Sequence, residues 1–297
     1  MSSKLTVAAD SGGTEAQDRE LAAFMAALER ELAAGEVSLP SWSKVTERAR
    51  NALAAPSFNV DELARILGAE AGLAVRVLTL ANSAMFMRGG RPLSDLKLAI
   101  LRIGHDMLRS AVYAHALLQL RQAPRLQRLR PVLQELWRES TQVAALARLV
   151  AARTADSDPD AALLAGLLHN IGKLYLYVRL DARDDQSLAE PVSVTLLTAW
   201  HARIGAAIAR NWQMPETLCQ AVADQDLLDD GSSQSPLGAA LSVAVIGANA
   251  TTDPAQLEDT AAHLANFSRF GLNAAEWLEL LGRAQAESTA LRVTFGD

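Results

Sequence analysis

Apolar residues recur at helical spacing along most of this chain of 297 residues. The run from Leu73 to Ala84 places its apolar positions on one broad helical face, and the run from Leu96 to Gly104 does the same. No segment combines sustained alternation of apolar and polar residues with turn dipeptides, which is the pattern of paired strands. The pattern therefore predicts an all-α protein.

Capping residues and prolines predict where several of these helices begin. Asp158-Pro159, Ser235-Pro236 and Asp253-Pro254 each place a capping side chain directly before a proline that fits the first helical turn. Ser94 is the predicted cap of a helix that runs to Gly104, and another helix follows that glycine directly. These signals divide the chain into a series of separate helices.

The order of the segments predicts one helical core with additions at both ends. Residues 1–13 are small and polar and are expected to form a flexible tail, followed by an N-terminal helix over residues 14–37. The predicted core covers residues 38–235. Residues 236–297 are expected to form a C-terminal helical extension packed on that core.

Composition narrows the class of protein and its surroundings. Half of the residues are apolar, as in globular proteins, and a formal net charge of −6 argues against a generic nucleic-acid-binding protein. Cys219 is the single cysteine, so no internal disulfide and no cysteine zinc cluster are expected. The N-terminus lacks the long apolar region of a signal peptide, and Gly238 to Ala250 is too short to span a membrane. We expect a soluble, cytoplasmic protein with no membrane or nucleic-acid partner.

The stretch from Gly166 to Lys173 is the main candidate for chemistry, because His169 and Asn170 interrupt a run of leucine and isoleucine there. Glycines flank the pair, and a glycine inside a helical pattern usually has a packing or functional reason. The histidine can be a metal ligand or a core residue whose hydrogen bonds are satisfied between packed helices.

Several short motifs occur in a fixed order along the chain. They are Leu39-Pro40, Leu78 to Ala84, Ala99 to Gly104, Trp137-Arg138 with Ser140, Gly166 to Gly172, and Trp212 with Met214-Pro215. In this order and approximate spacing, they resemble the HDOD family, whose name denotes an HD-related output domain, over roughly residues 38 to 230. The resemblance implies a bacterial, all-helical, HD-like bundle that acts as a regulatory or signalling module. It also implies the loss of most metal ligands of the HD superfamily of metal-dependent phosphohydrolases.

The resemblance further implies which residues occupy the positions of the HD metal ligands. Glu139 and the Gln225-Asp226 pair stand where HDOD proteins often carry histidine, while Asn170 and Asn249 stand where HD enzymes carry aspartate. His201 matches a histidine that HDOD sequences commonly keep. The expected HD-equivalent polar cluster is Glu139, His169, Asn170, His201, Gln225, Asp226 and Asn249.

Two interpretations of this cluster stay open. HD chemistry needs histidines together with ionised carboxylates, which bind a divalent metal and balance its charge. If Glu139, His169, His201 and Asp226 converge, they offer two nitrogen and two carboxylate ligands that suit zinc, manganese or iron. We favour a hydrogen-bonded structural cluster without a metal or other cofactor, because the amide of Asn170 is neutral and a weak ligand.

Two other pairs of polar residues have mainly structural interpretations. Asn82 and Ser83 are expected to cap the end of a helix, with the lining of a pocket as the alternative. His105 and His115 are too far apart in sequence to share a helix face closely. Both histidines are therefore expected at or near the surface.

The basic segment contains Arg121, Arg125, Arg128 and Arg130. A run of charges is usually a solvated helix face, which is the interpretation we favour, and contacts to an anionic ligand are the alternative.

Together these observations predict a non-catalytic bacterial signal-transduction module that binds a protein partner or a small ligand. One alternative is a metal-dependent phosphohydrolase or phosphodiesterase with a rearranged HD site. The other is a nucleotide-binding receptor that uses the basic segment.

Overall fold

The computed structural model describes residues 11–37, 39, 43–55, 59–87, 91–181, 190–226, 235–249 and 269–295. No strand occurs within these ranges, so the predicted all-α class is confirmed. The elements are α1 (Ser11–Ala34), α2 (Lys44–Ala54), α3 (Val60–Gly68), α4 (Ala71–Ala81), α5 (Leu96–Arg121), the 3₁₀ helix η1 (Pro124–Leu129), α6 (Arg130–Ala151), α7 (Pro159–Leu168), α8 (Ile171–Asp181), α9 (Glu190–Asn211), α10 (Glu216–Ala223), α11 (Pro236–Asn249) and α14 (Ala274–Phe295).

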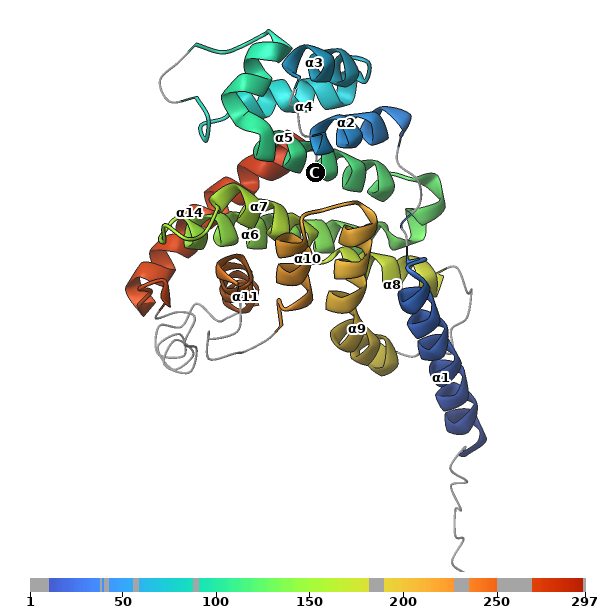
Figure 1. Cartoon of the computed structure of the whole chain (residues 1–297). Coiled ribbons are helices and arrows are strands. Elements are labelled where there is room, and N and C mark those ends of the chain that lie inside the picture. Colours follow the sequence, from blue (N-terminus) through green and yellow to red (C-terminus); the bar gives the residue numbers. More distant parts are fainter. Residues whose placement is uncertain are drawn as a thin grey trace, which may run out of the picture.

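The helices pack around two hydrophobic cores (Figure 1). Helices α2 to α5 enclose the first core, which also receives Ala144 from α6 and Leu163 and Leu167 from α7. Helices α6 to α11 enclose the second core, to which α1 and α14 also contribute buried side chains such as Phe24 and Trp277, and Leu291 of α14 belongs to the first core. Helices α6 and α7 therefore contribute to both cores and join the two halves of the molecule.

Local sequence signals account for the helix boundaries. Asp158 caps α7 by accepting hydrogen bonds from the amides of Asp160 and Ala161, and Ser235 accepts one from Gly238 at the start of α11. Both predicted caps are confirmed, while the Asp253-Pro254 cap lies outside the described residues.

The cap predicted at Ser94 is wrong by one position. Asp95 accepts the hydrogen bond from the amide of Leu98, at 2.8 Å, and is the N-cap of α5. Gly104 breaks the regular geometry of this helix with φ of 77°, a conformation that residues with a side chain rarely adopt. The predicted change of helix at Gly104 is therefore present as a kink within α5.

Two glycines permit close crossings in the second core. A Cβ atom on Gly166 would lie 2.4 Å from the Cα atom of Ala144, and one on Gly172 would lie 1.9 Å from the carbonyl oxygen of His201. Helix α7 can therefore approach α6, and α8 can approach α9, more closely than any larger residue would allow. The packing reason expected for these glycines is present at both positions.

The ends of the chain pack on the second core by different contacts. In α1, Phe24 and Leu28 are buried, and Glu31 accepts a hydrogen bond from Tyr175 and pairs with Arg179 of α8. In α14, the buried Trp277 ring occupies the space beside Gly247 of α11.

Among the described residues, one continuous segment, Pro159–Asp181, is long and apolar enough to cross a membrane by length and composition. Most of its apolar window, 72%, is buried inside the fold, where α7 and α8 contribute to the cores. This burial is typical of a core helix in a water-soluble fold.

We predict that Gly172→Ala lowers the free energy of unfolding by about 3 kcal/mol, the upper range for overpacking, because the new methyl group collides with backbone atoms of α9. Gly282→Ala is the matched control, because its Cβ meets nothing within 4 Å on the exposed side of α14. That control should stabilise the protein by up to about 1 kcal/mol through helix propensity. Urea unfolding followed by circular dichroism measures both, and equal values for the two variants would contradict the close crossing.

Candidate functional site

His169 and Asn170 lie at the junction between α7 and α8, inside the second core. His169 is 3% exposed and Asn170 is 3% exposed. The close crossings at Gly166 and Gly172 bring α6 and α9 against this junction from two sides. The surrounding helices thus bury both polar side chains almost completely.

The imidazole of His169 has a defined protonation pattern. Its Nδ1 atom lies 2.7 Å from the carbonyl oxygen of Gly166. A carbonyl can only accept, so Nδ1 carries the proton and Nε2 keeps a lone pair. Burial lowers the pKa of His169 to about 3, and the nearby Lys173 and His201 act in the same direction. His169 is therefore a neutral hydrogen-bond acceptor at neutral pH.

His201 of α9 pairs with Asp226, which follows α10. Nε2 of His201 lies 2.9 Å from Oδ2 of Asp226. Burial raises the pKa of the Asp226 carboxyl group, but the hydrogen bond and charge of His201 outweigh it and hold the pKa below its ordinary value. These two predicted site residues pair directly, while the buried Nδ1 atom of His201 has no hydrogen-bond partner among the described residues.

Asn170 and Glu139 form a second direct contact. Nδ2 of Asn170 donates to Oε2 of Glu139 on α6 at 3.0 Å. A neutral amide can donate in this way, whereas an aspartate at this position would face another carboxylate. The buried Oδ1 atom of Asn170 has no hydrogen-bond partner within the described part of the chain.

Gln225 has a structural role in this cluster. It is fully buried and donates to the carbonyl oxygens of His169 and Val222, at 3.1 and 3.0 Å. These hydrogen bonds fix the end of α10 to the α7–α8 junction. The side chain of Asn249, the remaining member of the predicted cluster, lies outside the described residues.

Glu139, His169, His201 and Asp226 line one cavity of about 490 Å³, which we call the central polar cavity. Arg138 and Lys173 also line it. The structure thus brings the four proposed ligands around one space. Lys173 was not among the site residues predicted from the sequence, although it is the last residue of the candidate stretch and directly follows Gly172.

The side chains around the central polar cavity do not fit the metal site of an HD hydrolase. Within the described ranges, no three His, Cys, Asp or Glu side chains lie close enough to hold one ion. His201 is already paired with Asp226, and Glu139 accepts from Asn170. A catalytic divalent ion needs several such groups directed at one point, together with an open position for water.

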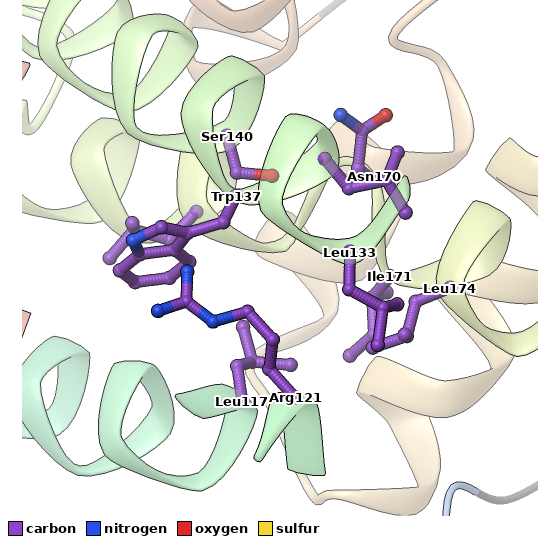
Figure 2. Close-up of a pocket in the computed structure, with 10 residues that line it drawn as sticks. Leu117, Arg121, Leu133, Trp137, Ser140, Asn170, Ile171 and Leu174 are labelled. Carbon is purple, nitrogen blue, oxygen red and sulfur yellow. The ribbon is translucent and has the colours of Figure 1, made fainter. Parts of the chain in front are cut away.

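Asn170 also lines a smaller cavity of about 40 Å³ (Figure 2). Leucine side chains, Trp137, Ser140 and Asn170 line it, and the guanidinium of Arg121 lies over the Trp137 ring at 5.4 Å from its centroid. This contact fixes Arg121 against an aromatic face.

The four arginines of the basic segment do not converge. Arg121 packs against Trp137, Arg128 pairs with Asp181 of α8 at 3.4 Å, and Arg125 and Arg130 are exposed. An anion site needs several cations directed at one place. The placement agrees with the favoured solvated face.

Asn82 and Ser83 both act at the end of α4. Ser83 donates to the carbonyl oxygen of Leu80 at 2.7 Å, as expected of a C-terminal cap. Asn82 is the C-cap residue of α4, as expected, and its side-chain amide exchanges two hydrogen bonds with the backbone of Leu93. It anchors the segment before α5, and both residues also line a shallow cavity beside α14.

The expectation that His115 lies near the surface is wrong. It is 4% exposed, and its Nε2 atom lies 2.8 Å from Glu70 at the start of α4. Gln119 and Ser43 donate to the same carboxylate. A largely buried carboxylate such as Glu70 needs hydrogen-bond donors, and His115 lies between the helices to supply one. This contact joins residues far apart in the chain, so the spacing of the histidines in the sequence does not predict it. His105 is half-buried, as expected of a boundary residue.

Comparison with known proteins agrees with this architecture. The family model described as HDOD domain matches residues 39–227, and the chain belongs to this family. An uncharacterized protein of Treponema pallidum (strain Nichols) is 26% identical over 190 residues, which are 61% of this chain and 36% of that protein. The chain thus spans about a third of the length of this curated relative.

Solved structures share the fold. A proposed metal-dependent phosphohydrolase from Shewanella amazonensis SB2B is 23% identical, with a TM-score of 0.67 over 92% of this chain and 99% of that chain. An HDOD domain protein of unknown function from Geobacter sulfurreducens is 21% identical, with a TM-score of 0.59 over 90% and 98%. A proposed signal transduction protein from Marinobacter aquaeolei VT8 is 19% identical, with a TM-score of 0.55 over 91% and 60%.

We predict that His169 makes the folded protein sensitive to acid. The unfolded histidine takes up a proton near pH 6.5 and the folded one only near pH 3, so the stability present above pH 6.5 is progressively lost as the pH falls between these values. From pH 7 to pH 5 the loss from this group is about 2 kcal/mol. His169→Asn, whose amide can still donate to Gly166, should flatten the pH dependence of urea unfolding in that window. If the free energy of unfolding depends on pH in the same way in the wild type and in His169→Asn, His169 is not the source of the acid sensitivity.

Proposed function

We propose that this chain is a non-catalytic regulatory HDOD module that acts by binding a protein partner or a small ligand. One observation carries the proposal. The polar groups expected to hold a metal are joined in two direct pairs, Asn170 with Glu139 and His201 with Asp226. Each pair removes a carboxylate from the set that would have to bind and balance a divalent ion.

The central polar cavity supports a binding role. Its volume of about 490 Å³ lies within the range of small-molecule sites and can also accept a side chain of a partner protein. Arg138 and Lys173 bring positive charge to its lining, and Glu135, Glu139 and Asp226 bring negative charge. A lining of both signs favours a ligand or peptide that itself carries both kinds of polar group.

The similar structures include both a proposed signalling protein and a proposed phosphohydrolase. The Marinobacter protein is described as a proposed signal transduction protein, and the Shewanella protein as a proposed metal-dependent phosphohydrolase. The side chains of this chain separate the two classes better than the shared fold does, because function depends on the site. The amide at Asn170 favours the signalling class.

We predict that Asn170→Asp destabilises the metal-free protein by about 2 kcal/mol, because a donor to Glu139 becomes a second buried carboxylate. Added Mn²⁺ should raise the melting temperature of this variant and leave that of the wild type unchanged. Circular dichroism melts with and without MnCl₂ measure both effects. The double variant Glu139→Gln/Asn170→Asp is the control, because it restores the hydrogen bond with the donor and acceptor exchanged.

Elemental analysis of wild-type protein purified without a metal-affinity step tests the non-catalytic assignment. We expect no stoichiometric zinc, manganese or iron and no hydrolysis of bis(4-nitrophenyl) phosphate. Near-stoichiometric metal, together with hydrolysis that His169→Ala abolishes, would establish the phosphohydrolase instead.

A further inference from the structure

A second cavity, of about 460 Å³, lies between the end of α2, the middle of α5 and the turn that joins α9 to α10. We call it the arginine cavity. It shares no lining residue with the central polar cavity, so its properties are independent of the proposed function. Its lining includes Arg50, Leu53, His105, Arg109, Trp212 and Met214.

The charged side chains of this lining are cationic. Arg50 of α2 and Arg109 of α5 reach the cavity from two helices, and no carboxylate side chain is among the described residues that line it. Burial raises the pKa of the Tyr113 hydroxyl to about 12, while the charges of Arg50 and Arg109 both oppose this increase. Both arginines line this one cavity, in a protein whose net charge is −6.

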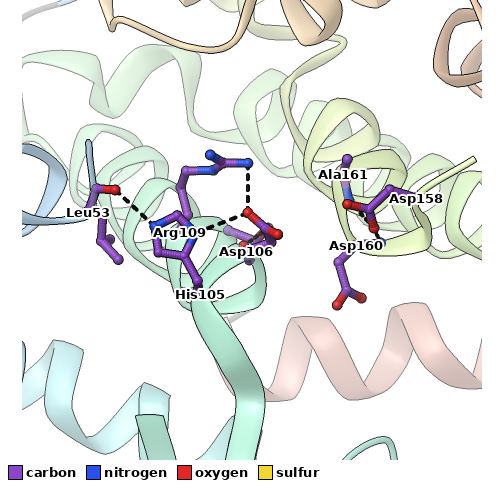
Figure 3. Close-up of polar contacts among 8 residues, drawn as sticks. Leu53, His105, Asp106, Arg109, Asp158, Asp160 and Ala161 are labelled. Carbon is purple, nitrogen blue, oxygen red and sulfur yellow. Dashed lines mark hydrogen bonds and ion pairs between the residues drawn. The ribbon is translucent and has the colours of Figure 1, made fainter. Parts of the chain in front are cut away.

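His105 and Arg109 are held in position by their neighbours (Figure 3). Figure 3 shows the ring of His105 between the carbonyl oxygen of Leu53, at 2.9 Å, and the carboxylate of Asp106, at 3.1 Å. Arg109 reaches the same carboxylate at 3.0 Å. The side chains that face the cavity are thus fixed before any ligand binds, which lowers the entropic cost of binding.

Arg109 retains an unused donor. Its Nε atom is buried and has no hydrogen-bond partner within the described residues. This buried Nε atom presents almost no surface to the cavity, so an anion there would meet the exposed part of the Arg109 side chain, which is 19% exposed. Phosphate fits the fork of a guanidinium group well.

The remaining lining is flat and apolar. The rings of Tyr113 and Trp212 are stacked, with centroids 5.6 Å apart, and the Tyr113 hydroxyl donates to the Trp212 carbonyl oxygen at 3.3 Å. Leu53 and Met214 add aliphatic surface beside them. A ligand that is anionic at one end and flat at the other would satisfy both parts of the lining.

We propose that the arginine cavity binds a phosphorylated small molecule of about mononucleotide size whose uncharged part is a flat ring. Gln213 also lines the cavity. Its backbone has a positive φ of 57°, which is uncommon for a residue with a side chain. Gln213 thus adds a polar residue to the lining that contains Tyr113 and Trp212. This site differs from the basic segment at Arg121 to Arg130, whose arginines do not converge.

Isothermal titration calorimetry of the full chain with AMP, adenosine and inorganic phosphate tests the proposal. We expect saturable binding of AMP, at least about tenfold tighter than either fragment, because the fragments lose the ring or the charge-assisted hydrogen bonds. The variant Arg50→Gln/Arg109→Gln should weaken AMP binding by about tenfold or more. Arg50→Gln alone provides the test if the double variant does not fold.

The matched control is Arg125→Gln/Arg128→Gln, which removes the same charge from the exposed basic segment. It should change AMP affinity by no more than about twofold, because exposed distant charges are screened. Absence of saturable AMP binding, or equal losses in the two double variants, overturns the site. Equal affinity for AMP and phosphate overturns the assignment of a flat ring.

Discussion

The close approach of four helices around the α7–α8 junction is the constraint on which the site depends. Gly166 lets α7 pack against the backbone of α6, and Gly172 lets α8 pack against the backbone of α9. With larger residues the helices would separate, and His169 would be less buried. Its neutral state follows from that burial, because desolvation disfavours the charged imidazole.

Burial at this depth also explains why the position after His169 carries an amide. A buried carboxylate needs a cation or several donors, whereas an amide can be buried at lower cost when it is hydrogen-bonded. Asn170 meets that requirement with Glu139, and Gln225 does the same with the backbone of His169. These hydrogen bonds join the members of the polar cluster, while the buried Oδ1 of Asn170, Nδ1 of His201 and Oε1 of Gln225 have no partner among the described residues.

Helix α9 and the turn that follows it link the two cavities. The helix carries His201 at the central polar cavity, and the turn after its last residue carries Trp212 at the arginine cavity. The hydroxyl of Tyr113 joins that turn to α5. The two cavities are therefore connected through one continuous segment, while the side chains that line each of them come from different parts of the chain.

The sequence determined those features that depend on residues within one or two helical turns. The helical class, the caps at Asp158 and Ser235 and the break at Gly104 were all predicted from it. The shift of the α5 cap from Ser94 to Asp95 is a local error of one residue. The resemblance to the HDOD family also selected His169, His201 and Asp226 as members of one cluster, and in the structure these three residues line one cavity.

Only the tertiary structure decided which side chains pair across helices. The contacts of His201 with Asp226 and of His115 with Glu70 join residues of different helices, and the convergence of Arg50 and Arg109 joins α2 to α5. The spacing of His105, Asp106 and Arg109 was a local signal for part of the arginine cavity, because residues three or four apart share a helix face. The rest depends on helix crossing distances and angles, which are set by packing over the whole core.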